Sequence, residues 1–183
     1  MVGVLLGSGA TFLATSLVER SRWRRTQTSR WDDRRLTAYA DYANSVKAAA
    51  RMCQRIMVGK GILTGGQGIP LAEGLEALTE IGNERAVNWE PVLLLGEPET
   101  VRTAQGWAAS VWELERLVHD TDIDQTGFIT AYKESVRLRN LFYTCARRDL
   151  GVHLGELPQP EFPQFTRQQI AGQNNSVNGS SDK

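Results

Sequence analysis

The chain has few of the residues that usually carry enzymatic chemistry or bind metals. Its 183 residues include only two cysteines and two histidines. Cys53 and Cys145 are far apart in the sequence and form no C-x-x-C pattern, which excludes the common zinc-binding and thioredoxin-type motifs. His119 and His153 have no partner at metal-ligand spacing. The sequence therefore predicts no catalytic residue, no cofactor and no metal centre.

The familiar catalytic and phosphate-binding motifs are missing as well. The chain contains no G-x-S-x-G and no H-E-x-x-H. The glycine-rich stretch GKGILTGGQGIP, residues 59–70, lacks the G-K-[ST] ending of a P-loop, because Lys60 is followed by Gly61. No strand pattern precedes this stretch. We interpret it as a flexible crossover between helices.

Net charge is zero over the whole chain, but the charges are unevenly distributed. Residues 19–35 contain seven arginines and three acids, whereas residues 71–99 contain seven glutamates and one arginine. The basic segment is suited to phosphates or anionic lipid. The acidic segment is typical of the solvated face of a helix.

A stretch without any charge opens the chain. Residues 2–18 read VGVLLGSGATFLATSLV, which as a helix spans roughly 25 Å and lies at the short end for a bilayer crossing. The arginines follow the apolar run instead of preceding it, which favours an uncleaved anchor over a signal peptide. The remaining alternative is a buried helix of a soluble fold. We therefore expect a transmembrane anchor at 1–18 and an Arg-rich juxtamembrane neck at 19–35.

The arginine excess also predicts how this anchor is oriented. Positively charged flanks stay in the cytoplasm, so we expect a single-pass cell-membrane protein with its amino terminus outside and its carboxyl-terminal domain cytoplasmic. Gly3 and Gly7 form a G-x-x-x-G pattern, which lets two membrane helices approach closely. A homodimer is therefore one alternative for the assembly, and the lipid bilayer is the first expected partner.

The remainder of the chain has helical periodicity and no strand pattern. The first helix after the neck carries apolar residues three or four apart: Leu36, Tyr39, Ala43, Val46, Ala50, Cys53 and Met57. A second helix begins at Leu71; we expect Pro91 to kink or split it and Gly96 to end it. No glycine or proline interrupts residues 11–58, so the anchor is expected to continue directly into the first helix.

Two further helices complete the predicted fold. Glu97-Pro98-Glu99 starts the third, with an apolar face of Val101, Ala104, Ala108, Val111, Leu114 and Val118. Trp107 and Trp112 are interpreted as packing residues. The fourth runs from about Gly127 to Leu150, with a face of Phe128, Tyr132, Val136, Phe142, Cys145 and Ala146. We predict an all-α antiparallel bundle of about four helices at 36–152, with the two cysteines at opposite ends.

The carboxyl-terminal segment is polar and rich in proline. LPQPEFPQF is followed by QQIAGQNNSVNGSSDK, and neither stretch contains enough apolar surface to offset the entropy of ordering. We expect residues 153–183 to form a disordered tail.

The stretch DIDQTGFITAYKE, residues 122–134, resembles a calcium loop. Asp122, Asp124 and Thr126 occupy ligand positions 1, 3 and 5, and Gly127 occupies position 6. Position 12, which should be a bidentate glutamate, is Lys133. The alternative is that these residues are turn and N-cap residues of the fourth helix. We favour the second interpretation and keep the EF-hand-like loop Asp122–Thr130 as an alternative.

Several of these stretches together match a known pattern. They are ERSRWRR after the apolar start, then RWDDRRLTAYADYANSVK, LLLGEPETVRTA and FYTCARRDLGV. In this pattern the chain resembles uncharacterised small single-span membrane-anchored helical proteins of actinobacteria, over about residues 2–152. The resemblance implies an architecture and a location, but no activity.

The sequence thus favours a non-enzymatic, membrane-anchored cytoplasmic helical domain with an interaction or scaffold role and a protein partner that it does not identify. A calcium-responsive module, through Asp122–Thr130, is the first alternative. Binding of anionic lipid or nucleic acid by the Arg-rich neck is the second, and a neck beside a membrane favours lipid over nucleic acid.

Overall fold

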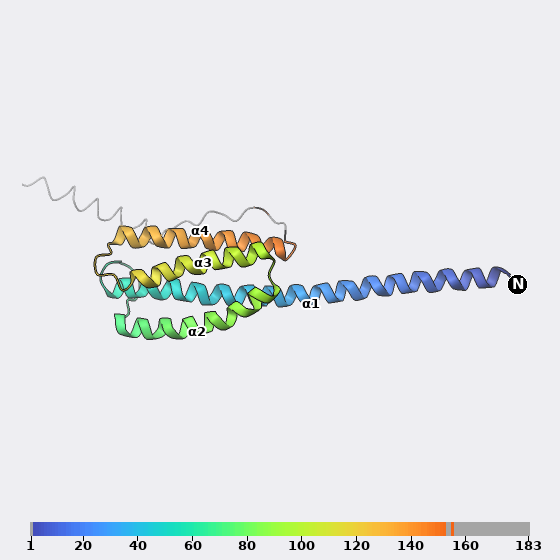
Figure 1. Cartoon of the computed structure of the whole chain (residues 1–183), viewed down its shortest axis with the longest axis horizontal. Helices are drawn as coiled ribbons and strands as arrows, with labels where there is room; N and C mark the ends of the chain where they lie inside the picture. Colours follow the sequence, from blue (N-terminus) through green and yellow to red (C-terminus); the bar gives the residue numbers. More distant parts are fainter. Residues whose placement is uncertain (1, 153–154, 156–183) are drawn as a thin grey trace, which may run out of the picture.

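A computed structural model describes residues 2–152 and 155, with side chains from Trp31 onward. The described residues form four α-helices and no strand: α1 (Val2–Gly59), α2 (Leu71–Leu95), α3 (Pro98–Leu117) and α4 (Gln125–Asp149). Figure 1 shows them as a bundle from which α1 extends as a single helix toward the amino terminus. The predicted all-α helical bundle is confirmed.

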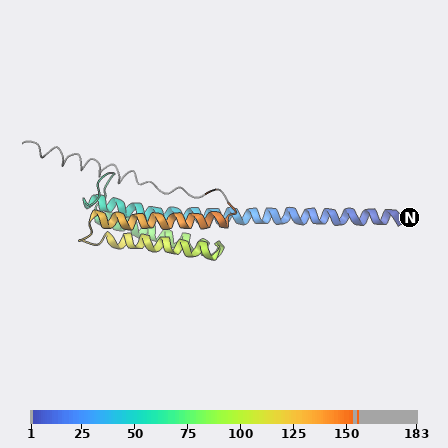
Figure 2. The same cartoon turned by 90° about the horizontal axis from the view of Figure 1, so that it is seen from above.

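Consecutive helices run in opposite directions (Figures 1 and 2). The closest pairs are α1 with α2, α3 with α4 and, less extensively, α1 with α3. The connections between consecutive helices are short, which favours the antiparallel arrangement that we predicted from the sequence. Since α2 and α3 are absent from these closest pairs, the two helices flank α1 without packing tightly on each other.

The core is built mainly from α1, α3 and α4. The predicted apolar face of α1 is buried from Tyr39 to Met57, but Leu36 is 56% exposed. The face of α3 is buried except for Val101, and that of α4 except for Tyr132, which are both half-buried. Leu36 is exposed because it lies where the other helices end.

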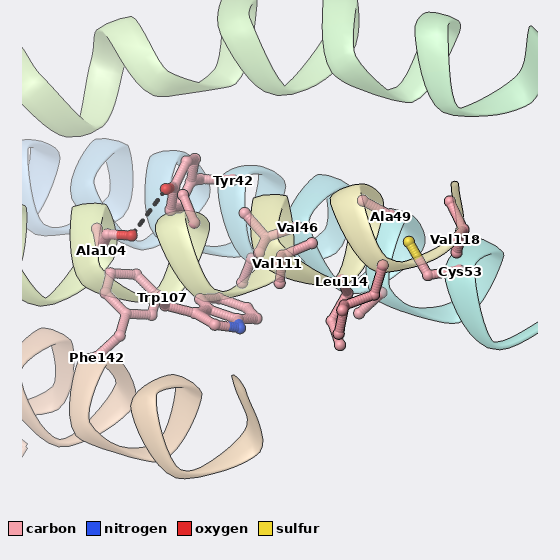
Figure 3. Close-up of a cluster of buried hydrophobic side chains, with 14 of the residues drawn as sticks. Tyr42, Val46, Ala49, Cys53, Ala104, Trp107, Val111, Leu114, Val118 and Phe142 are labelled. Carbon is pink, nitrogen blue, oxygen red and sulfur yellow. Dashed lines mark hydrogen bonds between the residues drawn. The ribbon is translucent and has the colours of Figure 1, made fainter. Parts of the chain in front are cut away.

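Aromatic rings fill the middle of the core. Tyr42, Trp107 and Phe142 come from α1, α3 and α4, and their ring centroids lie 5.7–6.4 Å apart. The Tyr42 hydroxyl donates a hydrogen bond to the Ala104 carbonyl oxygen at 3.0 Å (Figure 3). Buried ring pairs of this kind contribute about 0.5–1.5 kcal/mol each beyond the area they bury. The cluster therefore fixes α1, α3 and α4 relative to one another.

The glycine-rich crossover closes one end of the bundle and is fastened at several points. The Ile69 N–H donates to the Arg55 carbonyl oxygen at 3.2 Å, and Leu63 is buried. A Cβ on Gly59 would lie 2.0 Å from the Ile69 carbonyl oxygen, and one on Gly68 would lie 2.7 Å from the Gly59 nitrogen. These glycines let the two ends of the crossover touch, so the stretch is more closely held than the free crossover we expected.

The helix ends largely follow the sequence. Pro98 lies in the first turn of α3, as predicted. Pro91 does not split α2, which continues to Leu95 and bends toward α1 over its last turns (Figure 1). Gly96 ends α2 with an extended backbone, φ −79° and ψ 146°, instead of a left-handed cap. Glycine is needed there because a Cβ would lie 2.7 Å from the Val92 carbonyl oxygen.

The expected membrane anchor and tail gain no support from the structure. Within the described part of the chain, no helix combines the length and the apolar character that a membrane crossing requires. The side chains of residues 1–30, which cover the expected anchor and most of the neck, lie outside the described residues. The predicted disordered tail at 153–183 also lies outside them, apart from Gly155.

Candidate functional site

A groove lies between α2 and α3, where the two helices separate over α1. Its volume is about 480 Å³, within the range of ligand-binding clefts. We name it the aromatic groove, and it is lined by Tyr42, Gly82, Arg85, Ala86, Trp89, Gln105, Ala108, Ala109 and Trp112. Only one of these, Tyr42, comes from α1. The other lining residues belong to the two helices that form the walls.

The sequence creates this groove through residue size. Each wall combines two very small residues with one tryptophan and one long polar side chain, and the small residues leave space between the larger ones. A Cβ added to Gly82 would meet no atom within 4 Å. Trp89 contacts the ring of Tyr42 at a centroid distance of 5.5 Å, which fixes one wall. Figure 3 shows Tyr42 in the core cluster that the groove reaches.

The charged side chain that lines the groove, Arg85, is paired with a carboxylate beside it, and the Tyr42 hydroxyl donates to the Ala104 carbonyl oxygen. Arg85 of α2 binds Glu115 of α3 through two contacts of 2.7 and 3.4 Å. The Arg85 side chain is only 10% exposed, and its guanidinium lies 5.5 Å from the Trp112 ring centroid. Burial raises the pKa of Tyr42 to about 12, against the opposing effect of Arg85, so the phenol stays neutral. The groove thus offers a mainly apolar surface whose one charged side chain is neutralised by Glu115 beside it.

Trp112 is the residue that sequence reasoning placed wrongly. We interpreted it as a packing residue together with Trp107, but Trp112 is 57% exposed while Trp107 is 2% exposed. Trp107 lies within the predicted apolar face of α3, whereas Trp112 lies at its edge, about 90° around the helix axis from its centre, and this offset was the signal that could have separated the two. Leu93, one turn beyond Trp89 on the same side of α2, is 49% exposed and extends the apolar strip.

The calcium-like loop is arranged as a helix start. The Asp124 carboxylate accepts a hydrogen bond from the Gly127 N–H at 2.7 Å and caps α4. Asp120 accepts from the Asp122 N–H at 2.9 Å, as in a turn. The Lys60 ammonium donates to the carbonyl oxygens of Val118 and Asp120 at 3.0 and 2.8 Å. The geometry of this segment therefore matches the interpretation of its residues as turn and N-cap residues of α4.

The acidic side chains and the two thiols of the described residues show no metal-binding group and no disulfide. No group of three or more His, Cys, Asp or Glu side chains in this part of the chain is placed to hold a metal. Cys53 and Cys145 are both free and buried, on α1 and α4. Burial raises the pKa of the Cys53 thiol to about 12, so it stays protonated at neutral pH and is a poor nucleophile.

An ionic cluster at the neck end of the bundle was not foreseen. The Asp149 carboxylate, at the end of α4, accepts from the Arg35 guanidinium at 2.9 Å, from the Tyr39 hydroxyl and from the Glu97 N–H at 2.9 Å. Arg148 pairs with Glu99 at 2.8 Å beside it. We name these residues the Asp149 cluster.

This cluster unites three of the stretches on which the resemblance was based. RWDDRRLTAYADYANSVK supplies Arg35 and Tyr39, LLLGEPETVRTA supplies Glu97, and FYTCARRDLGV supplies Asp149. Sequence spacing alone could not join them, because the contacts link residues at least 49 positions apart. No family model, curated protein or solved structure matches the chain.

Proposed function

We propose that the protein is a non-enzymatic, membrane-tethered interaction module whose aromatic groove receives a segment of a partner protein. The observation that carries this proposal is the exposed Trp112, which lines a 480 Å³ groove whose one charged lining residue, Arg85, is already paired. Large exposed aromatic side chains around a concave apolar surface are typical of interaction hot spots.

The chemistry of α2 favours a particular kind of partner. The exposed surface of α2 carries Glu73, Glu76, Glu80, Glu84 and Glu90. Of these glutamates, only Glu90 lies within about 100° of the groove residue Trp89 around the helix axis. This helix has one cation, Arg85, which is neutralised by Glu115. A segment with one or two large apolar side chains would fill the groove, and a lysine or arginine beside them would meet Glu90, the glutamate of α2 that lies nearest the groove around the helix axis.

The membrane tether rests on the sequence. We propose that residues 1–18 cross the bilayer with the amino terminus outside, that the Arg-rich neck at 19–35 lies at the inner face, and that the bundle is cytoplasmic. The unbroken course of α1 from Val2 to Gly59 supports a direct helical link between tether and bundle. The resemblance to single-span actinobacterial proteins favours the same architecture.

The groove can be tested with a photo-crosslinking amino acid at Ala109, on its exposed wall, in cells that express the full-length protein. The matched control carries the same group at Thr144, which is exposed on α4. We expect a discrete adduct from Ala109 that is absent from Thr144 and is lost when Trp112→Ala or Trp89→Ala is added. Equal adducts at both positions, or an adduct that survives both substitutions, would overturn the proposed docking surface.

The tether needs its own experiment. Membranes containing the full-length protein with a carboxyl-terminal tag are washed with alkaline carbonate and then treated with protease from outside. Retention in the membrane with a protected tag is the expected result. Release by carbonate would show that the first residues of α1 belong to a soluble fold, and would leave the groove proposal untouched.

A further inference from the structure

A second, smaller groove separates α1 from α4 on the other side of α1. Its volume is about 120 Å³, and its lining includes Lys47, Arg51, Trp107, Tyr132, Ser135 and Arg139. Lys47 lies about 140° around the α1 axis from Tyr42, which separates this groove from the aromatic one. We name it the cationic groove.

Three cations converge there without a carboxylate. Among the described residues, none of the salt bridges involves Lys47, Arg51 or Arg139. Arg139 reaches only the neighbouring Asn140 amide oxygen, at 3.4 Å. Burial and the charges of Arg51 and Arg139 lower the pKa of Lys47. The three side chains therefore repel one another, which costs stability unless an anion lies between them.

The sequence keeps negative charge away from this groove. Between Tyr42 and Lys60, α1 and the start of the crossover contain four cations and no acid. The only acid of α4 near this level, Glu134, pairs with Arg137 at 2.7 Å on the exposed side. An uncompensated cluster at a concave site is a natural receptor for an oxyanion, since guanidinium groups bind phosphate through paired hydrogen bonds.

The size and position of the groove indicate the kind of anion. At about 30 Å³ per water molecule, 120 Å³ holds about four waters, enough for one phosphate group, so the remainder of a larger ligand would lie outside the groove. If residues 1–18 form the anchor, Lys47 lies roughly 40 Å further along the continuous α1 helix, at ~1.5 Å per residue. A lipid headgroup of the same membrane would not reach that far.

We propose that Lys47, Arg51 and Arg139 form a binding site for the phosphate group of a soluble ligand. The site is spatially separate from the aromatic groove, and the proposal does not rest on the partner proposed for that groove. Binding would offset the repulsion between the three cations and would link α1 to α4. The half-buried Tyr132, whose pKa is raised by burial, contributes a neutral phenol to the same lining.

The test measures binding of inorganic phosphate and pyrophosphate to the full-length protein in detergent, by calorimetry and by the shift in melting temperature. Lys47→Gln and Arg139→Gln are the test variants. Arg137→Gln is the matched control, because it removes the same charge from α4 outside the groove. We expect saturable binding, weakened about tenfold or more in the test variants and unchanged in the control.

A second measurement distinguishes loss of binding from loss of folding. Without phosphate, Lys47→Gln and Arg139→Gln should melt at or above the wild-type temperature, because each relieves repulsion. The proposed site would be overturned by a lower melting temperature in both test variants or by the absence of saturable phosphate binding. It would also be overturned if Arg137→Gln weakened phosphate binding as much as the test variants do. Binding to phosphatidylglycerol vesicles but not to phosphate, lost in Arg139→Gln, would overturn the assignment to a soluble ligand.

Discussion

Replacing Asp149 with asparagine should loosen the bundle where it joins the neck. The carboxylate is 2% exposed and accepts three hydrogen bonds, from Arg35, Tyr39 and the Glu97 N–H. These donors belong to α1 and to the connection between α2 and α3, so one side chain of α4 holds three segments. Asparagine keeps the shape but removes the charge and turns one acceptor into a donor.

The expected cost can be worked out from those contacts. Removing one partner of a buried ion pair costs about 3–5 kcal/mol, but Arg35 is 27% exposed and keeps Glu97 at 3.7 Å as a second partner. The amide N–H then faces either the Tyr39 hydroxyl or the Arg35 guanidinium in place of an oxygen, which adds about 1–3 kcal/mol, since Tyr39 is 4% exposed. Discounted for the exposure of Arg35, Asp149→Asn should lower the free energy of unfolding by about 2–4 kcal/mol.

Urea unfolding of the full-length protein in detergent, followed by far-ultraviolet circular dichroism, measures this loss. Asp41→Asn is the control, because its carboxylate is exposed on α1. Tyr39→Phe should cost about 1–2 kcal/mol alone and much less in the Asp149→Asn background, since the shared hydrogen bond is then already lost. A loss below about 0.5 kcal/mol, or full additivity of the two substitutions, would refute the assigned role of the cluster.

Three further perturbations follow from local geometry. Gly59→Ala should cost about 1–3 kcal/mol, because its Cβ would meet a carbonyl oxygen at 2.0 Å, whereas Gly106→Ala, with no atom within 4 Å, should gain about 0.8–1 kcal/mol in urea unfolding. Lys60→Met should lower the melting temperature, because the carbonyl oxygens of Val118 and Asp120 lose a hydrogen-bond donor. An unchanged melting temperature would show that these two hydrogen bonds do not stabilise the bundle. Burial raises the pKa of Tyr42 to about 12, so its contribution is intact below pH ~10 and is lost as the pH rises through 12. Tyr42→Phe should therefore flatten the decline of stability between pH 10 and 12 by about 1.4 kcal/mol per pH unit, and equal slopes would exclude this effect.

The sequence predicted the helices and most of the core because their determinants are local. Apolar spacing of three or four residues marked the buried faces of α1, α3 and α4, and Pro98 and Gly96 marked helix ends. The exposed Leu36 was missed because its burial depends on where other helices stop. The periodic pattern of α1 contains no information about the lengths of its neighbours.

The sites were missed for a related physical reason. Trp112 lies at the edge of the apolar face of α3, and whether an edge position is covered depends on how closely α2 approaches, which left this residue exposed. Lys47 and Arg139 become neighbours only when α1 and α4 pack together. Charged contacts across long sequence distances follow from topology, which short-range patterns do not determine.

The central position of α1 links all three features of the bundle. Tyr39 contributes to the Asp149 cluster, Tyr42 forms the floor of the aromatic groove, and Lys47 lies in the cationic groove, within about three turns of one helix. An anion that draws α4 toward α1 acts on the same helix that supports the aromatic groove. Since Trp107 of α3 lies in the cationic groove and also contacts Tyr42, the two grooves share a packed core. Phosphate binding should therefore change the crosslinking yield at Ala109 through that core, and an unchanged yield at saturating phosphate would show that the grooves act independently.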